Sequence, residues 1–414
     1  MHSVSWKRNI VFFLSGQTIS LLGTSMVQFA IMWHITLTTQ SGVMMTVAIL
    51  CGFVPTFILS PFAGVWADRY NRKKLIALAD AGIAAATLLL ALLFLAGYKP
   101  LWPLFLISAI RAVGTSVQMP AVGAFLPQLV PEDQLMRVNA VNGSIQSFIS
   151  LVSPMAGAAL LTFANMETIF LIDVATAAAA IFLLMRFVRE KPAERPAAAE
   201  GEERAGYFAE MLKGFRYVRG SRHLVHFFLF TAVYMIAVAP AAFLTPLQTA
   251  RSFGTEYWRL TAIEVAFSGG MIAGGALMAA WGGFRNRTFT MAAGMALFGA
   301  FTIGLGAAPV FPVYIAFMAA AGLTMPMFNT TSYTLLQEKV EGEYLGRVFG
   351  VMSMLSGSMM PIGMLIFGPV ADVVAIEWLL IGTGAFMLLQ GLLVFADKTL
   401  VSWGRPSAAE KPSG

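Results

Sequence analysis

The chain has 414 residues, of which 58% are hydrophobic and only 12% are charged. This charged share is about half of that in an average soluble domain, so the composition excludes a soluble chain of two or three domains. The net charge of +6 does not indicate a nucleic-acid partner, because 23 of the 27 Lys and Arg residues fall on one side when the apolar segments are threaded across a membrane.

Apolar segments of about twenty residues recur along the whole chain, and each can cross about 30 Å of hydrocarbon. Lys7 and Arg8 precede a first segment that is too long for a signal peptide, which places the N-terminus in the cytoplasm. An even number of helices returns the C-terminus to the same side of the plasma (inner) membrane. The predicted all-α polytopic membrane protein has helices at roughly 9–37, 43–64, 75–97, 101–124, 139–163, 167–188, 223–249, 260–282, 288–307, 310–332, 346–371 and 377–397.

The one long polar stretch, residues 189–222, divides the chain into two sets of six helices. Its Pro-, Ala- and Glu-rich start predicts a flexible linker. An internal repeat supports two related halves, because residues 130–138 align without gaps on residues 340–348. Residues 282–287 are also a degenerate copy of a loop in the first half. We predict a six-helix bundle over 1–188, a cytoplasmic linker over 189–222, a second bundle over 223–400 and a cytoplasmic tail over 401–414. The end of the linker predicts a short amphipathic helix on the cytoplasmic membrane face, with apolar residues Phe208, Met211, Leu212, Phe215 and Val218.

The loop between the second and third predicted helices has an ordered pattern of glycine, acid and bases, formed by Gly64, Asp68, Arg69, Arg72 and Lys73. It resembles the loop motif of the major facilitator superfamily. Asn71 stands where that family usually has glycine, and Asn also tolerates a left-handed backbone. The resemblance implies the major facilitator fold, with twelve helices in two pseudo-symmetric six-helix bundles, a substrate path between the halves and a monomer. It also implies a cytoplasmic gate, in which Asp68 lies at the N-terminal end of the eleventh helix and Arg69 and Arg72 bridge to nearby acids.

Ionisable residues inside the membrane are the best functional candidates, because a charge at a helix centre costs roughly 2.5–3.5 kcal/mol on insertion scales. Arg111 lies near the middle of the fourth helix, either facing a cavity and holding a carboxylate or forming a structural ion pair with another helix. Asp173 and Glu264 are candidates for proton coupling with Arg111. Asp80, near the start of the third helix, is expected to pair with the bases of the preceding loop.

Uncharged polar residues form stripes on two predicted helices, the first and the fifth, which favours a wet substrate cavity over helix–helix hydrogen bonds alone. Ser20 continues the stripe on the first helix, and Ser150 and Ser153 continue that on the fifth. The candidate cavity residues are Gln17, Thr24 and Gln28 on the first helix, Thr115 and Gln118 on the fourth, and Asn142 and Gln146 on the fifth.

A narrower resemblance covers residues from about 10 to about 395 and is to macrolide efflux antiporters and their siderophore-exporter relatives. It rests on stretches such as Ile172-Asp173-Val174 and Glu264 through Gly275. It implies export driven by the proton gradient, with small-molecule substrate, protons and the lipid bilayer as partners. The leading hypothesis is a proton-coupled exporter of amphipathic small molecules such as macrolide-like drugs. The alternatives are a siderophore or metabolite exporter and, from another class, a non-transporting receptor or scaffold.

Enzymatic and ATP-driven functions are not expected. The sequence has no phosphate-binding Gly-Lys-Ser/Thr loop, and its four His and one Cys show no catalytic or metal-ligating spacing. We therefore predict no cofactor, no metal and no enzymatic activity.

Overall fold

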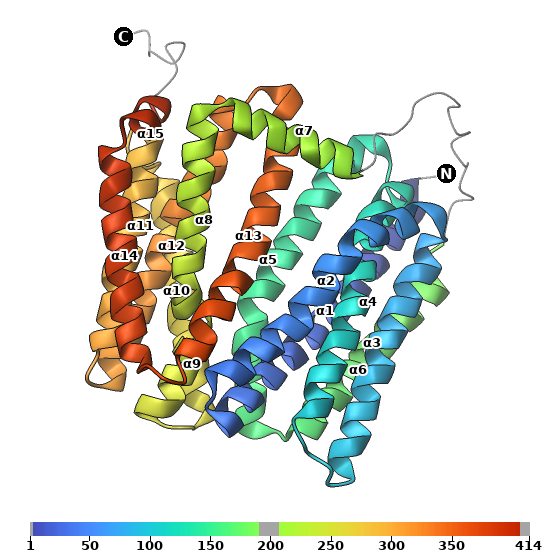
Figure 1. Cartoon of the computed structure of the whole chain (residues 1–414). Helices are drawn as coiled ribbons and strands as arrows, with labels where there is room; N and C mark the ends of the chain where they lie inside the picture. The colour runs from blue at the N-terminus through green and yellow to red at the C-terminus, as the bar shows by residue number, and fades with distance from the viewer. Residues whose placement is uncertain (1–2, 190–206, 406–414) are drawn as a thin grey trace. The chain divides into compact units, whose positions relative to one another are not determined.

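A computed structural model describes residues 3–189 and 207–405 of the chain. In these residues, 12 helices are long and apolar enough to cross a membrane, and each corresponds to one predicted helix. The membrane protein is therefore all-helical, as predicted (Figure 1). The first six spans are α1 (Ser3–Thr39), α2 (Gly42–Arg69), α3 (Arg72–Leu95), α4 (Trp102–Leu129), α5 (Glu132–Phe163) and α6 (Met166–Phe187). The others are α8 (Arg222–Phe243) with α9 (Thr245–Gln248) and the π-helical turn η1 (Thr249–Phe253), then α10 (Tyr257–Trp281), α11 (Arg287–Ala307), α12 (Phe311–Lys339), α13 (Gly342–Val370) and α14 (Ile376–Ala396).

Several helices run past the ends predicted from hydropathy. α5 begins at Glu132 rather than near residue 139, and α12 continues to Lys339 rather than ending near residue 332. Apolar composition marks the part of a helix that can lie in hydrocarbon, whereas the helix itself continues into water for as long as its backbone hydrogen bonds do. In the seventh span, by contrast, the regular helix ends earlier than predicted. Its regular helix ends at Phe243, shortly before Pro246, which has no N–H to continue the hydrogen-bond series.

Two helices lie outside the spans. α7 (Tyr207–Gly220) confirms the helix predicted at the end of the linker, whereas the flexible part of that linker falls outside the described residues. α7 packs on α13, where the ring of Tyr217 stacks on that of Tyr344 with centroids 4.2 Å apart. At the start of the expected tail from residue 401, α15 (Lys398–Trp403) is helical, and Asp397 caps it by accepting from Thr399 N and Leu400 N.

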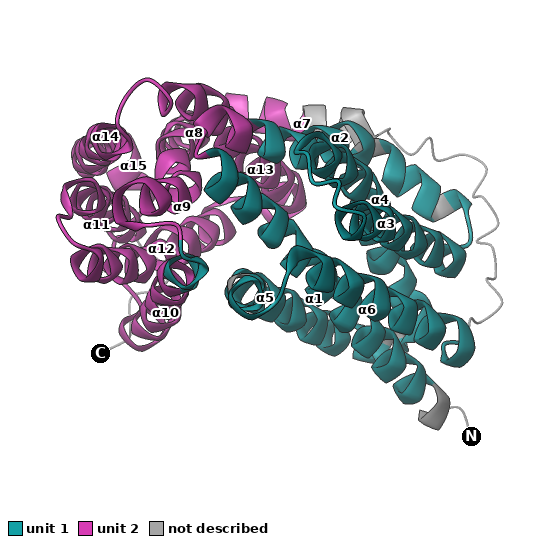
Figure 2. Cartoon of the chain, turned by 90° about the horizontal axis from the view of Figure 1, so that it is seen from below, with its two compact units in different colours: residues 1–39, 47–202, 256–261 teal, residues 40–46, 203–255, 262–414 magenta. Residues whose placement is uncertain are grey.

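The chain forms two compact units, coloured teal and magenta in Figure 2. Unit 1 contains residues 1–39, 47–202 and 256–261, and unit 2 contains residues 40–46, 203–255 and 262–414. In unit 1, α1 packs on α5 and α6, and α3 packs on α4 and α6. In unit 2, α8 packs on α13 and α14, and α11 packs on α12 and α14.

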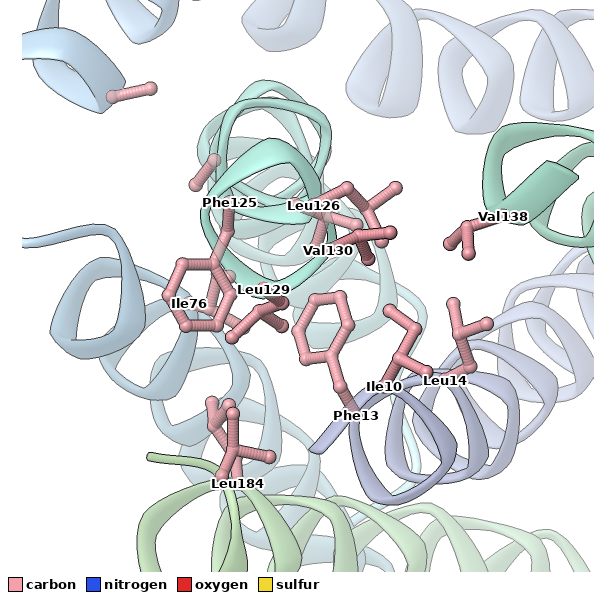
Figure 3. Close-up of a cluster of buried hydrophobic side chains, with 14 residues drawn as sticks. Ile10, Phe13, Leu14, Ile76, Phe125, Leu126, Leu129, Val130, Val138 and Leu184 are labelled. Atoms are coloured by element: carbon pink, nitrogen blue, oxygen red, sulfur yellow. The ribbon is translucent and has the colours of Figure 1, made fainter. Parts of the chain in front are cut away.

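One end of unit 1 is closed by a cluster of buried apolar side chains from α1, α3, α4, α5 and α6 (Figure 3). Phe13 and Phe125 form its centre, with ring centroids 5.3 Å apart in an edge-to-face arrangement. Ile76 on α3 and Leu184 on α6 pack beside them. The cluster joins these helices at this end of the bundle.

The internal repeat has a structural counterpart in each copy. Val130 and Val340 are extended residues that end α4 and α12, and the next helix begins two residues later in both cases. Asn71 and Asn286 likewise cap α3 and α11. The sequence alignment therefore extends to matching helix boundaries in the two halves.

Candidate functional site

The centre of unit 1 contains an ion pair that is isolated from solvent. Arg111 on α4 donates from Nη1 to Oδ2 of Asp173 on α6 over 2.6 Å, and the two side chains are 2% and 0% exposed. An Arg remains charged in proteins, and a buried cation is tolerated only beside an opposite charge or other acceptors. The two candidates that the sequence placed on separate helices thus form one site.

Two threonines form hydrogen bonds with both members of this pair, and Nε of Arg111 has no partner among the described residues. Thr87 on α3 accepts from Nη1 of Arg111 and donates to Oδ2 of Asp173 over 3.0 Å. Thr24 on α1 donates its hydroxyl to Oδ1 of Asp173 over 3.3 Å, and its carbonyl accepts from Nη2 of Arg111 over 2.9 Å. Four helices therefore meet at one charge pair, which we call the Arg111 layer. Gly23 permits the approach of α6, because a Cβ there would lie 2.3 Å from Oγ1 of Thr176.

A second polar layer lies on three of these four helices and surrounds Asp80 on α3, which is 2% exposed. Oδ1 of Asp80 accepts from Ser20 Oγ over 3.0 Å and from Gln118 Nε2 over 2.6 Å. The expected pairing of Asp80 with the loop bases is wrong. Asp80 faces into the bundle, where α1 and α4 supply its partners.

The spacing of the two layers is regular. Asp80 and Thr87 are seven residues apart on α3, as are Arg111 and Gln118 on α4. Seven residues are close to two helical turns, so each pair shares a helix face at a separation of about 10.5 Å along the axis. Because α3 and α4 run in opposite directions, the Asp80 layer, formed by Gln17, Ser20, Asp80 and Gln118, follows the Arg111 layer toward the apolar cluster.

The remaining predicted cavity residues lie in different surroundings. Gln17 is buried in the Asp80 layer, whereas Gln28, Asn142 and Gln146 are half-buried. Thr115 donates to the carbonyl of Arg111 on its own helix over 3.0 Å. A groove of about 430 Å³ runs between α1 and α5 and is lined by polar and apolar residues, among them Thr18, Arg137, Ser144 and Phe148.

Glu264, the third coupling candidate, lies on α10 in unit 2. Its side chain is half-buried, and no described residue forms a hydrogen bond or ion pair with it. Within unit 1, the structure therefore brings Arg111 and Asp173 together.

Comparison with known proteins places these helices in a family. The family model described as the Major Facilitator Superfamily matches residues 10–364. The chain belongs to this superfamily. A macrolide efflux protein A from Streptococcus pyogenes is 31% identical over 392 residues, covering 94% of each chain. An enterobactin exporter from Escherichia coli is 27% identical over 390 residues, covering 91% of this chain and 89% of the exporter.

Solved structures of the superfamily share the fold at low sequence identity. A bacterial homologue of the human lysosomal transporter Spinster matches with a TM-score of 0.69 and 14% identity, covering 99% of this chain and all of that one. A bacterial homologue of the iron transporter ferroportin also gives 0.69, with 15% identity and coverage of 96% and 99%. The protein is therefore a major facilitator transporter of small molecules in a membrane, and not an enzyme.

The loop motif of the superfamily is built around a two-residue turn between α2 and α3. Arg72 donates to the carbonyls of Ala67 and Ala124 over 2.9 and 3.0 Å, and Lys73 donates to that of Val188 over 2.7 Å. Asn71 has a φ of −63°, so it is extended rather than left-handed, and its side chain accepts from Lys74 N as the cap of α3. The substitution of glycine by Asn at this position therefore adds a helix cap.

The structure shows fewer contacts for the other residues of the loop motif. A Cβ on Gly64 would meet nothing within 4 Å, and Arg69 is exposed. The side chain of Asp68 lies outside the described part of the structure, so its expected contact with the eleventh span stays a prediction.

Sequence reasoning missed Thr87 and underrated Asp80. Both are signalled by their seven-residue spacing on α3, which matches the spacing of Arg111 and Gln118 on α4. No spacing within one helix, however, identifies the helix that supplies the partner.

Proposed function

We propose that the protein is a proton-coupled exporter of amphipathic small molecules such as macrolide-like drugs, which works by alternating access. Its similarity to a macrolide efflux protein over 94% of both chains supports the direction of transport and the class of substrate. The groove between α1 and α5 supports an amphipathic substrate, because hydroxyl groups and an aromatic ring line it together.

The observation that carries the proton coupling is the Arg111–Asp173 pair. Removing one partner of a buried ion pair costs about 3–5 kcal/mol, because it leaves the other charge uncompensated. A transporter that can neutralise one member of the pair, or change the charge beside it, has a switch of useful size, since allosteric coupling energies are about 1–3 kcal/mol. In this proposal Asp173 and Arg111 form the switch of unit 1, and Glu264 is the corresponding acid of unit 2. The loop motif, with Asp68 and its neighbouring bases, forms the cytoplasmic gate.

One specific observation supports a second candidate substrate. The enterobactin exporter is 27% identical over 91% of this chain, which favours a siderophore or another metabolite as the alternative. A non-transporting receptor or scaffold is the remaining alternative. The buried charges argue against it, because they cost free energy inside a membrane and a scaffold does not require them.

Transport by purified protein in inverted vesicles tests the proposal. We expect a macrolide to accumulate when the vesicle interior is acidic and the accumulation to stop when a protonophore collapses the gradient. A catechol siderophore is the second trial substrate, and gradient-driven uptake of that compound alone would select the alternative. No uptake of either compound by folded protein would contradict both.

The Asp173→Asn variant tests the switch, because it keeps the size of the side chain and removes its charge. We expect gradient-driven accumulation to fall at least about fivefold. The Arg111→Gln/Asp173→Asn double variant has no unpaired charge, so its thermal stability should exceed that of Asp173→Asn while transport stays uncoupled. Full gradient-driven transport by Asp173→Asn would exclude Asp173 as a coupling acid and direct attention to Glu264.

A further inference from the structure

The Asp80 layer differs from the Arg111 layer because no cation among the described residues contacts its carboxylate. Ser20 and Gln118 both donate to Oδ1, whereas Oδ2 of Asp80 has no hydrogen-bond partner among the described residues. An ionised carboxylate that is buried with one oxygen unpartnered is costly, because neither a charge nor a full set of donors compensates for its lost hydration. The site is therefore incomplete as long as Asp80 is ionised.

The charged groups on the surrounding helices do not compensate for it. Arg111 on α4 is already paired with Asp173 on α6, and Asp173 is itself a second negative charge close enough to act on Asp80. The single basic residue of α6 is Arg186, which lies in the last turn of that helix. On α1 no charged residue lies between Arg8 and His34.

The bases at the start of α3 are equally unavailable to Asp80. Arg72 and Lys73 donate to backbone carbonyls of other helices. Lys74 lies six residues before Asp80, and no hydrogen bond or ion pair between them is present in the described residues.

Protonation of Asp80 removes its uncompensated buried charge, whereas no basic side chain named above pairs with it. Gln17 lies close enough to Asp80 for its side-chain amide to interact with the carboxylate, and its Oε1 has no hydrogen-bond partner among the described residues. An O–H on Oδ2 removes the buried charge and supplies a donor within the layer that contains this free acceptor. The apolar cluster begins one helical turn away, at Phe13 and Ile76, and separates the layer from that end of the unit.

We propose that Asp80, held by Ser20 and Gln118, is the site at which unit 1 takes up the coupling proton. This inference rests on the proposed function and assigns the proton to a residue outside the Arg111–Asp173 pair. The proton comes from water on the acidic side and bonds to Oδ2, and it returns to water on the other side, with no other bond made or broken. Neutralising Asp80 removes the negative charge that opposes Asp173 and thereby strengthens the pair of the Arg111 layer, which links proton uptake to the switch.

Infrared spectroscopy of the purified protein in lipid tests the site without requiring transport. A neutral carboxylic acid has a carbonyl stretch that a carboxylate and a carboxamide lack at that frequency, and the band shifts in D₂O. We expect a band that appears as the pH is lowered, that is absent from Asp80→Asn and that is retained by Asp173→Asn. Asp133→Asn, at an exposed position, is the matched control. A band that persists unchanged in Asp80→Asn would overturn the assignment, as would the absence of any titrating band from the wild-type protein.

Thermal stability keeps the test decisive if a variant folds poorly. Asp80→Asn resembles the protonated residue, so at alkaline pH it should melt above the wild-type protein. Destabilisation at alkaline pH would show that the fold needs the carboxylate and would overturn the proposal. Ser20→Ala removes a donor to the carboxylate, so the acid band should persist to higher pH in that variant. Replacing K⁺ by Na⁺ at constant ionic strength should leave the band unchanged, and its loss in Na⁺ would identify a metal-cation site instead.

Transport then separates this inference from the proposed function. In inverted vesicles, Asp80→Asn should lose gradient-driven accumulation at least about fivefold while substrate exchange without a gradient continues. Gradient-driven transport that survives in Asp80→Asn would overturn the inference and leave the proposed function in place. An acid band at Asp80 in a protein that shows no gradient-driven transport would reject the proposed function and retain Asp80 as a protonation site.

Discussion

At the scale of single residues, Asp372 has the densest set of hydrogen bonds of any carboxylate outside the membrane spans that the structure describes. It follows α13 in unit 2 and accepts from Ser41 Oγ and from the backbone N–H groups of Gly42 and Val43, over 2.7, 2.7 and 3.0 Å. Arg251 donates to it over 2.8 Å. Partial burial raises the pKa of Asp372, but these hydrogen bonds, from Val43 first, outweigh it and hold the pKa below its ordinary value.

This lowered pKa predicts a loss of stability in acid. A carboxyl group with a depressed pKa in the folded state contributes stability above its unfolded value, near pH 4, and loses that contribution as the pH falls through the folded value. We expect Asp372→Asn to melt below the wild-type protein at pH 6, by an amount equivalent to about 0.3–1 kcal/mol for an anion at a helix N-terminus. The difference should shrink as the pH approaches 3. A difference that stayed constant over this range, or that appeared equally in Asp133→Asn, would reject the role of the charge.

At the scale of elements, α10 and α12 approach each other through glycine. A Cβ on Gly270 would lie 2.0 Å from the carbonyl oxygen of Ala319, and one on Gly274 would lie 2.1 Å from that of Leu323. On α12, a Cβ on Gly322 would lie 2.1 Å from the carbonyl oxygen of Phe267. Backbone atoms cannot rotate away as a side chain can, so these contacts exist only because the residues have no Cβ.

Neighbouring glycines provide a matched pair for testing this packing. Gly274→Ala forces the two helices apart and should destabilise the protein by about 1–3 kcal/mol, the usual cost of overpacking. Gly275→Ala has nothing within 4 Å of its new Cβ and should be neutral or stabilising by up to about 1 kcal/mol, because Ala favours helix. Thermal unfolding in detergent measures both. Equal effects of the two substitutions would show that helix propensity, and not the α10–α12 contact, determines the outcome.

The elements also show how far sequence reasoning extends. Hydropathy located each of the 12 described helices that can cross a membrane, because an apolar segment of that length has few alternatives to crossing one. The cost of burying charge identified Arg111 and Asp173 as important, but not as partners. The same argument predicted that Asp80 pairs with nearby bases, whereas in the structure Ser20 and Gln118 donate hydrogen bonds to it. Partner choice depends on which helices pack together and at what rotation, and no single helix contains that information.

At the scale of the whole molecule, the bases differ in what they bind. The three Lys and Arg residues on the predicted outer side each pair with an acid, namely Lys99 with Glu167, Arg251 with Asp372 and Arg259 with Glu256. On the opposite side, Arg72 and Lys73 donate to backbone carbonyls, and Arg287 and Arg347 pair with Glu338 and Glu343. Positive charge is in excess there because 23 of the 27 Lys and Arg residues are predicted to lie on that side, and this asymmetry retains loops in the cytoplasm.

This asymmetry predicts the orientation of the chain, which cysteine labelling in cells can measure. Cys51→Ser provides a background without cysteine, because Cys51 is the only one in the sequence. Tyr98→Cys, in the exposed α3–α4 loop, should react with a membrane-impermeant maleimide in intact cells. Arg285→Cys and Ser402→Cys, also exposed, should react only after the cells are permeabilised. Labelling of Arg285→Cys in intact cells would show that the chain has the orientation opposite to the one predicted. The acidic compartment would then face the other side of the bundle, and the direction of proton-driven export would reverse with it.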